Sequence, residues 1–159
     1  LNKKNTKSNL NLSLTNIDLL NISSNFPVNE NELDELIEKI FNSLYIKDYG
    51  LKEIHDIVMC FDENYYDPFE PWLHMGWALH NTNDILFWSW IKFSSKSAKF
   101  NYADIPERYV EWQNMKEDGY SFRSIYYWAQ NSFPEEFKKI ISAKDSTYSP
   151  LALYYLIDN

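Results

Sequence analysis

The chain has a single cysteine, Cys60, which excludes an internal disulfide and favours a reducing compartment. It lacks an apolar run of about 20 residues, the length that a membrane-spanning helix requires, and its start lacks the pattern of a secretory signal. With 159 residues, 45% of them hydrophobic, it is large enough to bury a core. We therefore expect a soluble intracellular domain. Because residue 1 is leucine rather than methionine, we also expect a piece of a longer protein.

Glycine is scarce, and this excludes several catalytic motifs. Gly50, Gly76 and Gly119 are far apart, so there is no glycine-rich phosphate loop and no Gly-x-Ser-x-Gly turn. The three histidines lack the i,i+4 spacing of metal ligands, and no cysteine pair supports a zinc site. Four acids between residues 62 and 70 lack the ordered spacing of a calcium loop. We expect no catalytic residue and no metal site.

The net charge of −8 argues against nucleic-acid binding. The distribution of charge weakens that argument, because residues 30–70 carry twelve acids against three lysines. Residues 71–159 are close to neutral, with ten acids against nine bases. Residues 85–103 contain three lysines and no acid. These three cations either belong to a solvated surface or form part of a site for an anion.

All six tryptophans lie between Trp72 and Trp128, where apolar side chains recur at helical spacing. Gly76 would let a second helix approach closely, and the segment after Asp84 is apolar on nearly every side. That pattern is typical of the buried central helix of a bundle. We predict an all-α fold, a compact bundle of about six to eight short helices after a disordered N-terminal tail. The expected helices begin near residues 30, 51, 71, 84, 104, 121, 134 and 150.

Exposed aromatic rings can stack on nucleobases, but tryptophans at helical spacing usually build a core. We assign five tryptophans to the core: Trp72, Trp77, Trp90, Trp112 and Trp128. Tyr127 differs, because it lies opposite the apolar face of its helix with Arg123 one turn before it. Arg123 and Tyr127 are a candidate seat for a base or ribose. The alternative is an ordinary surface pair.

A second candidate site follows the apolar helix, in the phrase Ser-Ser-Lys-Ser-Ala-Lys at residues 94–99. Its hydroxyl and ammonium groups suit phosphate oxygens. The alternative is an ordinary helix end, where lysines face the negative end of the helix dipole. The candidate phosphate ligands are Lys92, Ser94, Lys96, Ser97 and Lys99.

Several phrases together resemble a known family: Trp-Leu-His-Met-Gly-Trp-Ala-Leu-His at 72–80, Trp-Ile-Lys-Phe-Ser-Ser-Lys-Ser-Ala-Lys-Phe at 90–100, Trp112, and Ser-Phe-Arg-Ser-Ile-Tyr-Tyr-Trp-Ala at 121–129. From about Tyr65 to Ile140 the chain resembles the primase C-terminal helical domain of primase–helicase fusion proteins. These proteins occur in large DNA viruses, phages and plasmids, and the poxvirus-like and giant-virus helicase–primases are the most similar in character. Arg123 replaces a glycine of the family pattern.

The resemblance implies a noncatalytic all-α module between a primase domain and a helicase domain. It implies weak binding of single-stranded DNA or an initiating nucleotide, with ATP and Mg²⁺ bound only by the flanking domains. A homo-oligomer of the full-length protein and a location at viral replication sites are further expectations. The expected segments are a tail or linker at 1–29, an acidic helical region at 30–62, the primase-type domain at 63–143 and a C-terminal helix or linker at 144–159.

A different function is compatible with the same residues. The chain would then be a protein-interaction or spacer module that couples the primase and helicase domains without binding nucleic acid. In that case the acidic helix at 30–47 would contact a basic partner, and the net charge of −8 favours this alternative. An independent enzyme has little support, because no acid–base constellation is recognisable.

Overall fold

The computed structural model describes residues 26–43 and 49–142, and this part of the chain is helical throughout, without a strand. Its α-helices are α2 (Glu30–Asn42), α3 (Tyr49–Val58), α4 (Glu63–Tyr66), α5 (Phe69–His80), α6 (Phe87–Ser94), α7 (Ile105–Gln113), α8 (Phe122–Ser132) and α9 (Pro134–Ser142). Two 3-10 turns, η2 (Asp84–Leu86) and η3 (Tyr102–Asp104), precede α6 and α7. The predicted all-α bundle of short helices is confirmed. The predicted tail up to residue 25 and the segment from residue 144 lie outside the described residues.

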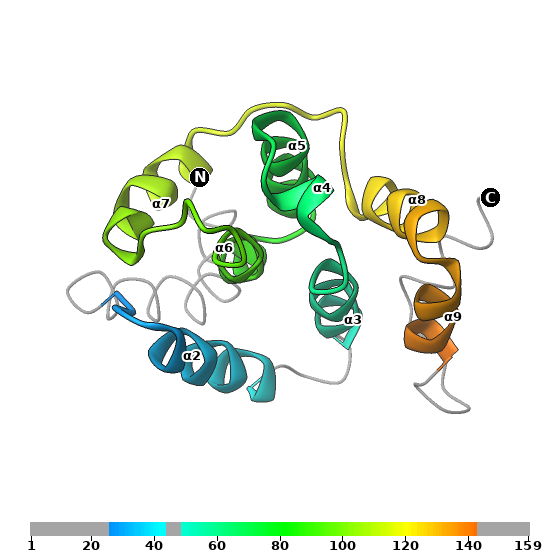
Figure 1. Cartoon of the computed structure of the whole chain (residues 1–159), viewed down its shortest axis with the longest axis horizontal. Coiled ribbons are helices and arrows are strands. Elements are labelled where there is room, and N and C mark those ends of the chain that lie inside the picture. Colours follow the sequence, from blue (N-terminus) through cyan, green and yellow to red (C-terminus); the bar gives the residue numbers. More distant parts are fainter. Residues whose placement is uncertain (1–25, 44–48, 143–159) are drawn as a thin grey trace, which may run out of the picture.

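Helix α6 is the centre of the bundle. In Figure 1 it is seen nearly end-on, with α5 above it, α3 to its right, α2 below it and α7 to its left. Every residue of α6 except Lys92 is buried. The sequence of α6 is apolar nearly all round because neighbouring helices cover it on several sides. This confirms the prediction that the segment after Asp84 forms the buried centre.

Several helix boundaries differ from the prediction. Helix α5 begins at Phe69 rather than Pro71, so Pro71 lies within the first turn, where its missing N–H leaves no hydrogen bond unmade. The helix expected near residue 84 begins as the 3-10 turn η2, which the Asn83 side chain caps by accepting the Ile85 N–H at 2.9 Å, and α6 follows from Phe87. The short helix α4 is not among the predicted helices.

The tryptophans divide into two groups. Trp90 and Trp112 are buried as predicted, and Trp88 is buried with them. Trp72, Trp77 and Trp128 are half-buried. Trp72 and Trp128 pack against the core from its edge, so their assignment to the core holds only in part. Helical spacing identifies the side of a helix that faces the bundle but does not show how completely a large ring is covered.

Gly76 allows Trp90 of α6 to pack directly against the backbone of α5. A Cβ atom at this position would lie 2.7 Å from Cε2 of Trp90, closer than side chains tolerate. Trp90 uses the space to stack on Trp72, with the ring centroids 4.8 Å apart, and its indole N–H donates to the Trp72 carbonyl at 3.1 Å. The predicted role of Gly76 is confirmed.

One hydrophobic core runs through the described residues from α2 to α9. Helix α2 packs on α6, and α3 packs on α6, α8 and α9, so the predicted segments 30–62 and 63–143 share this core. Lys92 of α6 adds ion pairs to α2, at 2.8 Å from Asp34 and 3.3 Å from Glu30. No described helix combines the length and apolar character that crossing a membrane requires.

Candidate functional site

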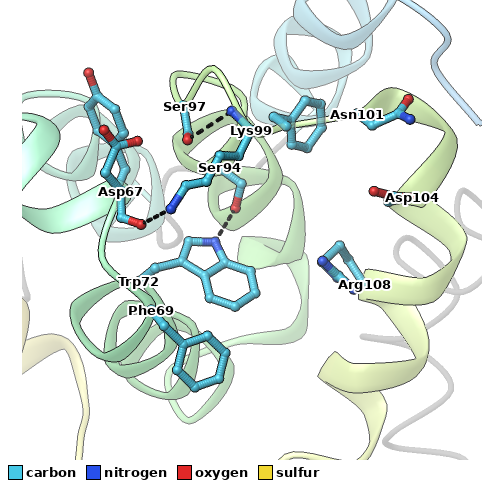
Figure 2. A pocket seen from close by; sticks show the side chains of 11 residues that line it. Asp67, Phe69, Trp72, Ser94, Ser97, Lys99, Asn101, Asp104 and Arg108 are labelled. Carbon is cyan, nitrogen blue, oxygen red and sulfur yellow. Dashed lines mark hydrogen bonds between the residues drawn. The ribbon is translucent and has the colours of Figure 1, made fainter.

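A cavity of about 190 Å³ lies where the start of α5, the end of α6 and α7 meet (Figure 2). The loop between α4 and α5 and the loop between α6 and α7 complete it. Its walls combine aromatic rings, two cations and several hydroxyl, amide and carboxylate groups. The lining residues are Tyr66, Asp67, Phe69, Trp72, Ser94, Ser97, Lys99, Phe100, Asn101, Asp104 and Arg108.

Trp72 and Phe69 form the aromatic wall of the cavity. The Trp72 indole N–H donates to the Ser94 hydroxyl at 2.6 Å, which fixes the orientation of the ring. Phe69 lies 5.8 Å from Trp72 between ring centroids and is 66% exposed. An exposed aromatic side chain beside a cavity suits contact with a ligand ring.

Lys99 supplies the cation at the upper edge of the cavity in Figure 2. Its ammonium donates to the backbone carbonyl of Asp67, and its backbone N–H donates to the Ser97 hydroxyl at 3.2 Å. An ammonium group has three N–H donors, so two remain available. Within the described residues, no carboxylate lies within ion-pair distance of Lys99.

Arg108 supplies a second cation from the opposite wall, on α7, and it belongs to none of the candidate sites predicted from the sequence. Its guanidinium lies 5.8 Å from the Trp72 ring centroid, within the range of a cation–π interaction. Glu111 at 2.9 Å and Glu107 at 3.4 Å pair with it. These carboxylates neutralise Arg108, so Lys99 is the stronger attraction for an anion.

The structure brings Ser94, Ser97 and Lys99 of the predicted phosphate ligands to one cavity, but they do not contribute equally. Ser94 is buried, and its hydroxyl donates to the Trp90 carbonyl at 2.7 Å while accepting from Trp72. Its hydrogen bonds therefore support the wall of the cavity. Ser97 and Lys99 remain accessible to a ligand at the rim.

Lys92 and Lys96 do not line this cavity, and each is engaged by another part of the chain. Burial lowers the pKa of Lys92, but its hydrogen bonds and charge interactions with Asp34 and Glu30 outweigh burial and raise it overall. Lys96 donates to the backbone carbonyl of Met59, and burial lowers its pKa. The three lysines that are close in sequence are thus not gathered around one anion site.

Arg123 and Tyr127 lie on α8, outside the lining of this cavity. The guanidinium of Arg123 lies 5.5 Å from the centroid of the Phe122 ring. Tyr127 is 60% exposed, as its position opposite the apolar face predicted. Arg123 and Tyr127 therefore do not belong to the cavity that contains Ser97 and Lys99.

The comparison with protein families identifies the domain. Residues 54–129 match the model of the family described as Primase C terminal 2 (PriCT-2). This segment belongs to the primase C-terminal family. Searches of curated proteins and of solved structures found no match. The family predicted from the motifs is confirmed, although both boundaries of the match lie earlier in the chain than the expected 65 and 140.

The matched primase C-terminal segment extends from within α3 to Ala129 in α8 and contains the whole lining of the cavity. Helices α2 and α9 lie outside the match, yet they pack on α6 and on α3 and α8, respectively. The domain in this chain is therefore larger than the segment by which its family is identified.

The acids around the cavity do not form a metal centre. Within the described residues there is no group of three or more histidine, cysteine, aspartate or glutamate side chains placed to hold a metal ion. The four acids between residues 62 and 70, which lie in and around α4 and the first turn of α5, form no such group either.

Proposed function

We propose that this domain is a noncatalytic accessory part of a replicative primase–helicase of a large DNA virus. In this proposal its cavity holds part of a single-stranded template or of an initiating nucleotide. The observation that carries it is the Lys99 ammonium, beside an aromatic wall and without a carboxylate partner in the described structure. ATP and Mg²⁺ would be bound by flanking domains at viral replication sites, in a full-length protein that forms a homo-oligomer.

The chemistry of the lining supports a nucleotide-type ligand. A nucleotide offers a flat ring and an anionic phosphate, and the cavity offers Phe69 and Trp72 for the first and Lys99 and Ser97 for the second. Its volume of about 190 Å³ is below the ~300–1,000 Å³ of pockets that enclose drug-sized ligands. We therefore infer that it holds one base or one ribose-phosphate while the rest of the ligand stays in solvent.

The balance of charge predicts weak binding. Arg108 is neutralised by its two glutamates, and Asp67 and Asp104 also line the cavity. Lys99 therefore acts almost alone against a net charge of −8. A domain of this kind would assist a catalytic neighbour by holding a strand or nucleotide briefly. It would not compete with that neighbour for tight binding.

Fluorescence anisotropy of labelled oligo(dT) over a salt series, with and without ATP as competitor, tests the proposal. We expect Lys99→Ala to weaken binding several-fold and to reduce the slope of log affinity against log salt by about 0.7, the change for one lost phosphate contact on a single strand. Lys138→Ala, an exposed lysine on α9, is the matched control. Equal losses in both variants would exclude the cavity as the binding site.

The second candidate function, an interaction or spacer module, is favoured by the acidic surface of α2. Two of its carboxylates, Glu30 and Asp34, are engaged by Lys92, whereas Glu35 and Glu38 are exposed. No binding of oligo(dT) or ATP at low salt and tens of micromolar protein would favour this function. Changed assembly of the full-length protein in Glu35→Gln/Glu38→Gln would then support it.

A further inference from the structure

A second cavity, of about 230 Å³, lies between α4, α5 and α8. It is lined by Tyr65, Glu70, Pro71, His74 and Trp128. His74 is five positions after Phe69, so at 100° per residue the two side chains lie about 140° apart around α5. The second cavity therefore belongs to a different face of α5 from the Lys99 cavity and shares no lining residue with it.

The aromatic walls of this cavity are held in place by contacts outside it. The Tyr65 hydroxyl lies 2.8 Å from the Ser132 hydroxyl, within hydrogen-bond distance. His74 stacks on Tyr120 with ring centroids 4.8 Å apart, and Tyr120 lies 5.8 Å from Trp128. Since the rings are positioned before any ligand binds, the conformational entropy lost on binding is small.

The second cavity has a carboxylate at its rim and no lysine or arginine in its lining, whereas the first has both cations and carboxylates. The carboxylate at the rim is that of the exposed Glu70. Helix α4, which supplies Tyr65, begins with exposed Glu63 after exposed Asp62. Aromatic faces carry negative electrostatic potential, so these rings and carboxylates attract a cation and repel phosphate.

We propose that this cavity binds the arginine or lysine side chain of a basic protein segment. The cation would lie against Trp128 and Tyr65, with Glu70 as its counter-ion. The net charge of −8 attracts basic partners at long range, and the cavity would bind one basic side chain of such a partner specifically. The site is independent of nucleotide binding, so loss of one leaves the other intact.

NMR titration of the ¹⁵N-labelled chain tests this site with N-acetyl-arginine amide as the probe. N-acetyl-citrulline amide, its neutral analogue of the same shape, is the control ligand. We expect saturable shifts of the Trp128 indole N–H and the Tyr65 and His74 amides at millimolar arginine, and much smaller shifts with citrulline. Equal shifts with both probes, or none with arginine, would overturn the proposal.

Two variants test separately how the Glu70 charge and the Trp128 ring contribute to binding of the arginine probe. Glu70→Gln should raise the Kd for the arginine probe about threefold or more, as expected for loss of one partly exposed charge partner. Glu135→Gln, an exposed glutamate on α9, should leave it unchanged. Trp128→Leu keeps apolar volume without an aromatic face and should abolish saturation in a folded protein, as checked by circular dichroism. If oligo(dT) instead shifts these signals and arginine does not, the cavity is a nucleic-acid site and the proposal fails.

Discussion

The indole N–H of Trp72 donates to the hydroxyl of Ser94 at 2.6 Å, and this bond joins the ligand-facing wall of the first cavity to the end of the buried helix α6. The same hydroxyl donates to the Trp90 carbonyl at 2.7 Å. One small side chain therefore fixes both the last turn of α6 and the ring of Trp72. A phrase that looks like a phosphate-binding motif in the sequence thus also has a structural role.

Ser94→Ala should destabilise the domain and weaken ligand binding together. It removes the acceptor for a partly buried indole N–H, which costs about 1–2 kcal/mol, and it releases the Trp72 ring. Urea unfolding and oligo(dT) anisotropy measure the two effects. Ser142→Ala, an exposed serine at the end of α9, should change neither by more than about 0.5 kcal/mol. If Ser94→Ala were destabilised but bound oligo(dT) with unchanged affinity, the orientation of the Trp72 ring would not contribute to binding.

Gly76→Ala should lower the free energy of unfolding by about 1–2 kcal/mol. The new methyl would lie 2.7 Å from the fully buried ring of Trp90, so the cost lies in the upper half of the usual overpacking range, about 2–3 kcal/mol. The better helix propensity of alanine offsets about 1 kcal/mol of it. Gly119→Ala is the matched control, because its Cβ would meet only the flexible Glu117 side chain, at 3.5 Å. A Gly76→Ala variant as stable as wild type would show that α5 and α6 do not pack this closely.

Much of the fold could be predicted because its signals are local. The side chain of Asn29 caps α2 and that of Ser121 caps α8, each accepting a backbone N–H within three residues. The apolar circumference of α6 is likewise readable from a short stretch. Helix α4 was missed because four residues contain no detectable period, and its start depends on Asp62 accepting the Asn64 N–H at 3.0 Å.

The site was predictable only where its residues are neighbours in sequence. Ser97 and Lys99 belong to one phrase, and their cavity position agrees with that phrase. Arg108 reaches Trp72 because α7 and α5 both pack on α6, and no local motif indicates that contact. Lys92 has a carboxylate partner 62 residues away, in Glu30, so its ion pairs could not be inferred from its own surroundings.

Stability should fall as the pH decreases, because of His55. Burial lowers its pKa from 6.5 to about 4; its ring packs 4.7 Å from Phe41, and Nδ1 lies 2.8 Å from the Ser89 hydroxyl. Between these pH values the unfolded chain binds a proton that the folded chain does not, so the stability present above pH 6.5 is lost toward pH 4, by about 3 kcal/mol.

His55→Gln tests this relation, because it removes the titrating group while keeping a polar side chain. Urea unfolding of both proteins at several pH values between 6.5 and 4 should show a steeper loss of stability in wild type than in the variant. The difference between the two proteins, rather than either curve alone, isolates His55 from the carboxylates that titrate at lower pH. Parallel curves would mean that burial of His55 does not control its protonation.

The separation of the predicted cations can be tested by single substitutions. Lys96→Ala and Arg123→Ala should each retain oligo(dT) affinity within about twofold, because neither side chain lines the Lys99 cavity. Lys99→Ala should lose several-fold more affinity than either, although all three remove one positive charge. Since long-range attraction falls equally in the three variants, a difference among them reports direct contact. The same anisotropy series at low and moderate salt measures it, and a loss in Arg123→Ala as large as in Lys99→Ala would move the nucleic-acid path to the surface of α8.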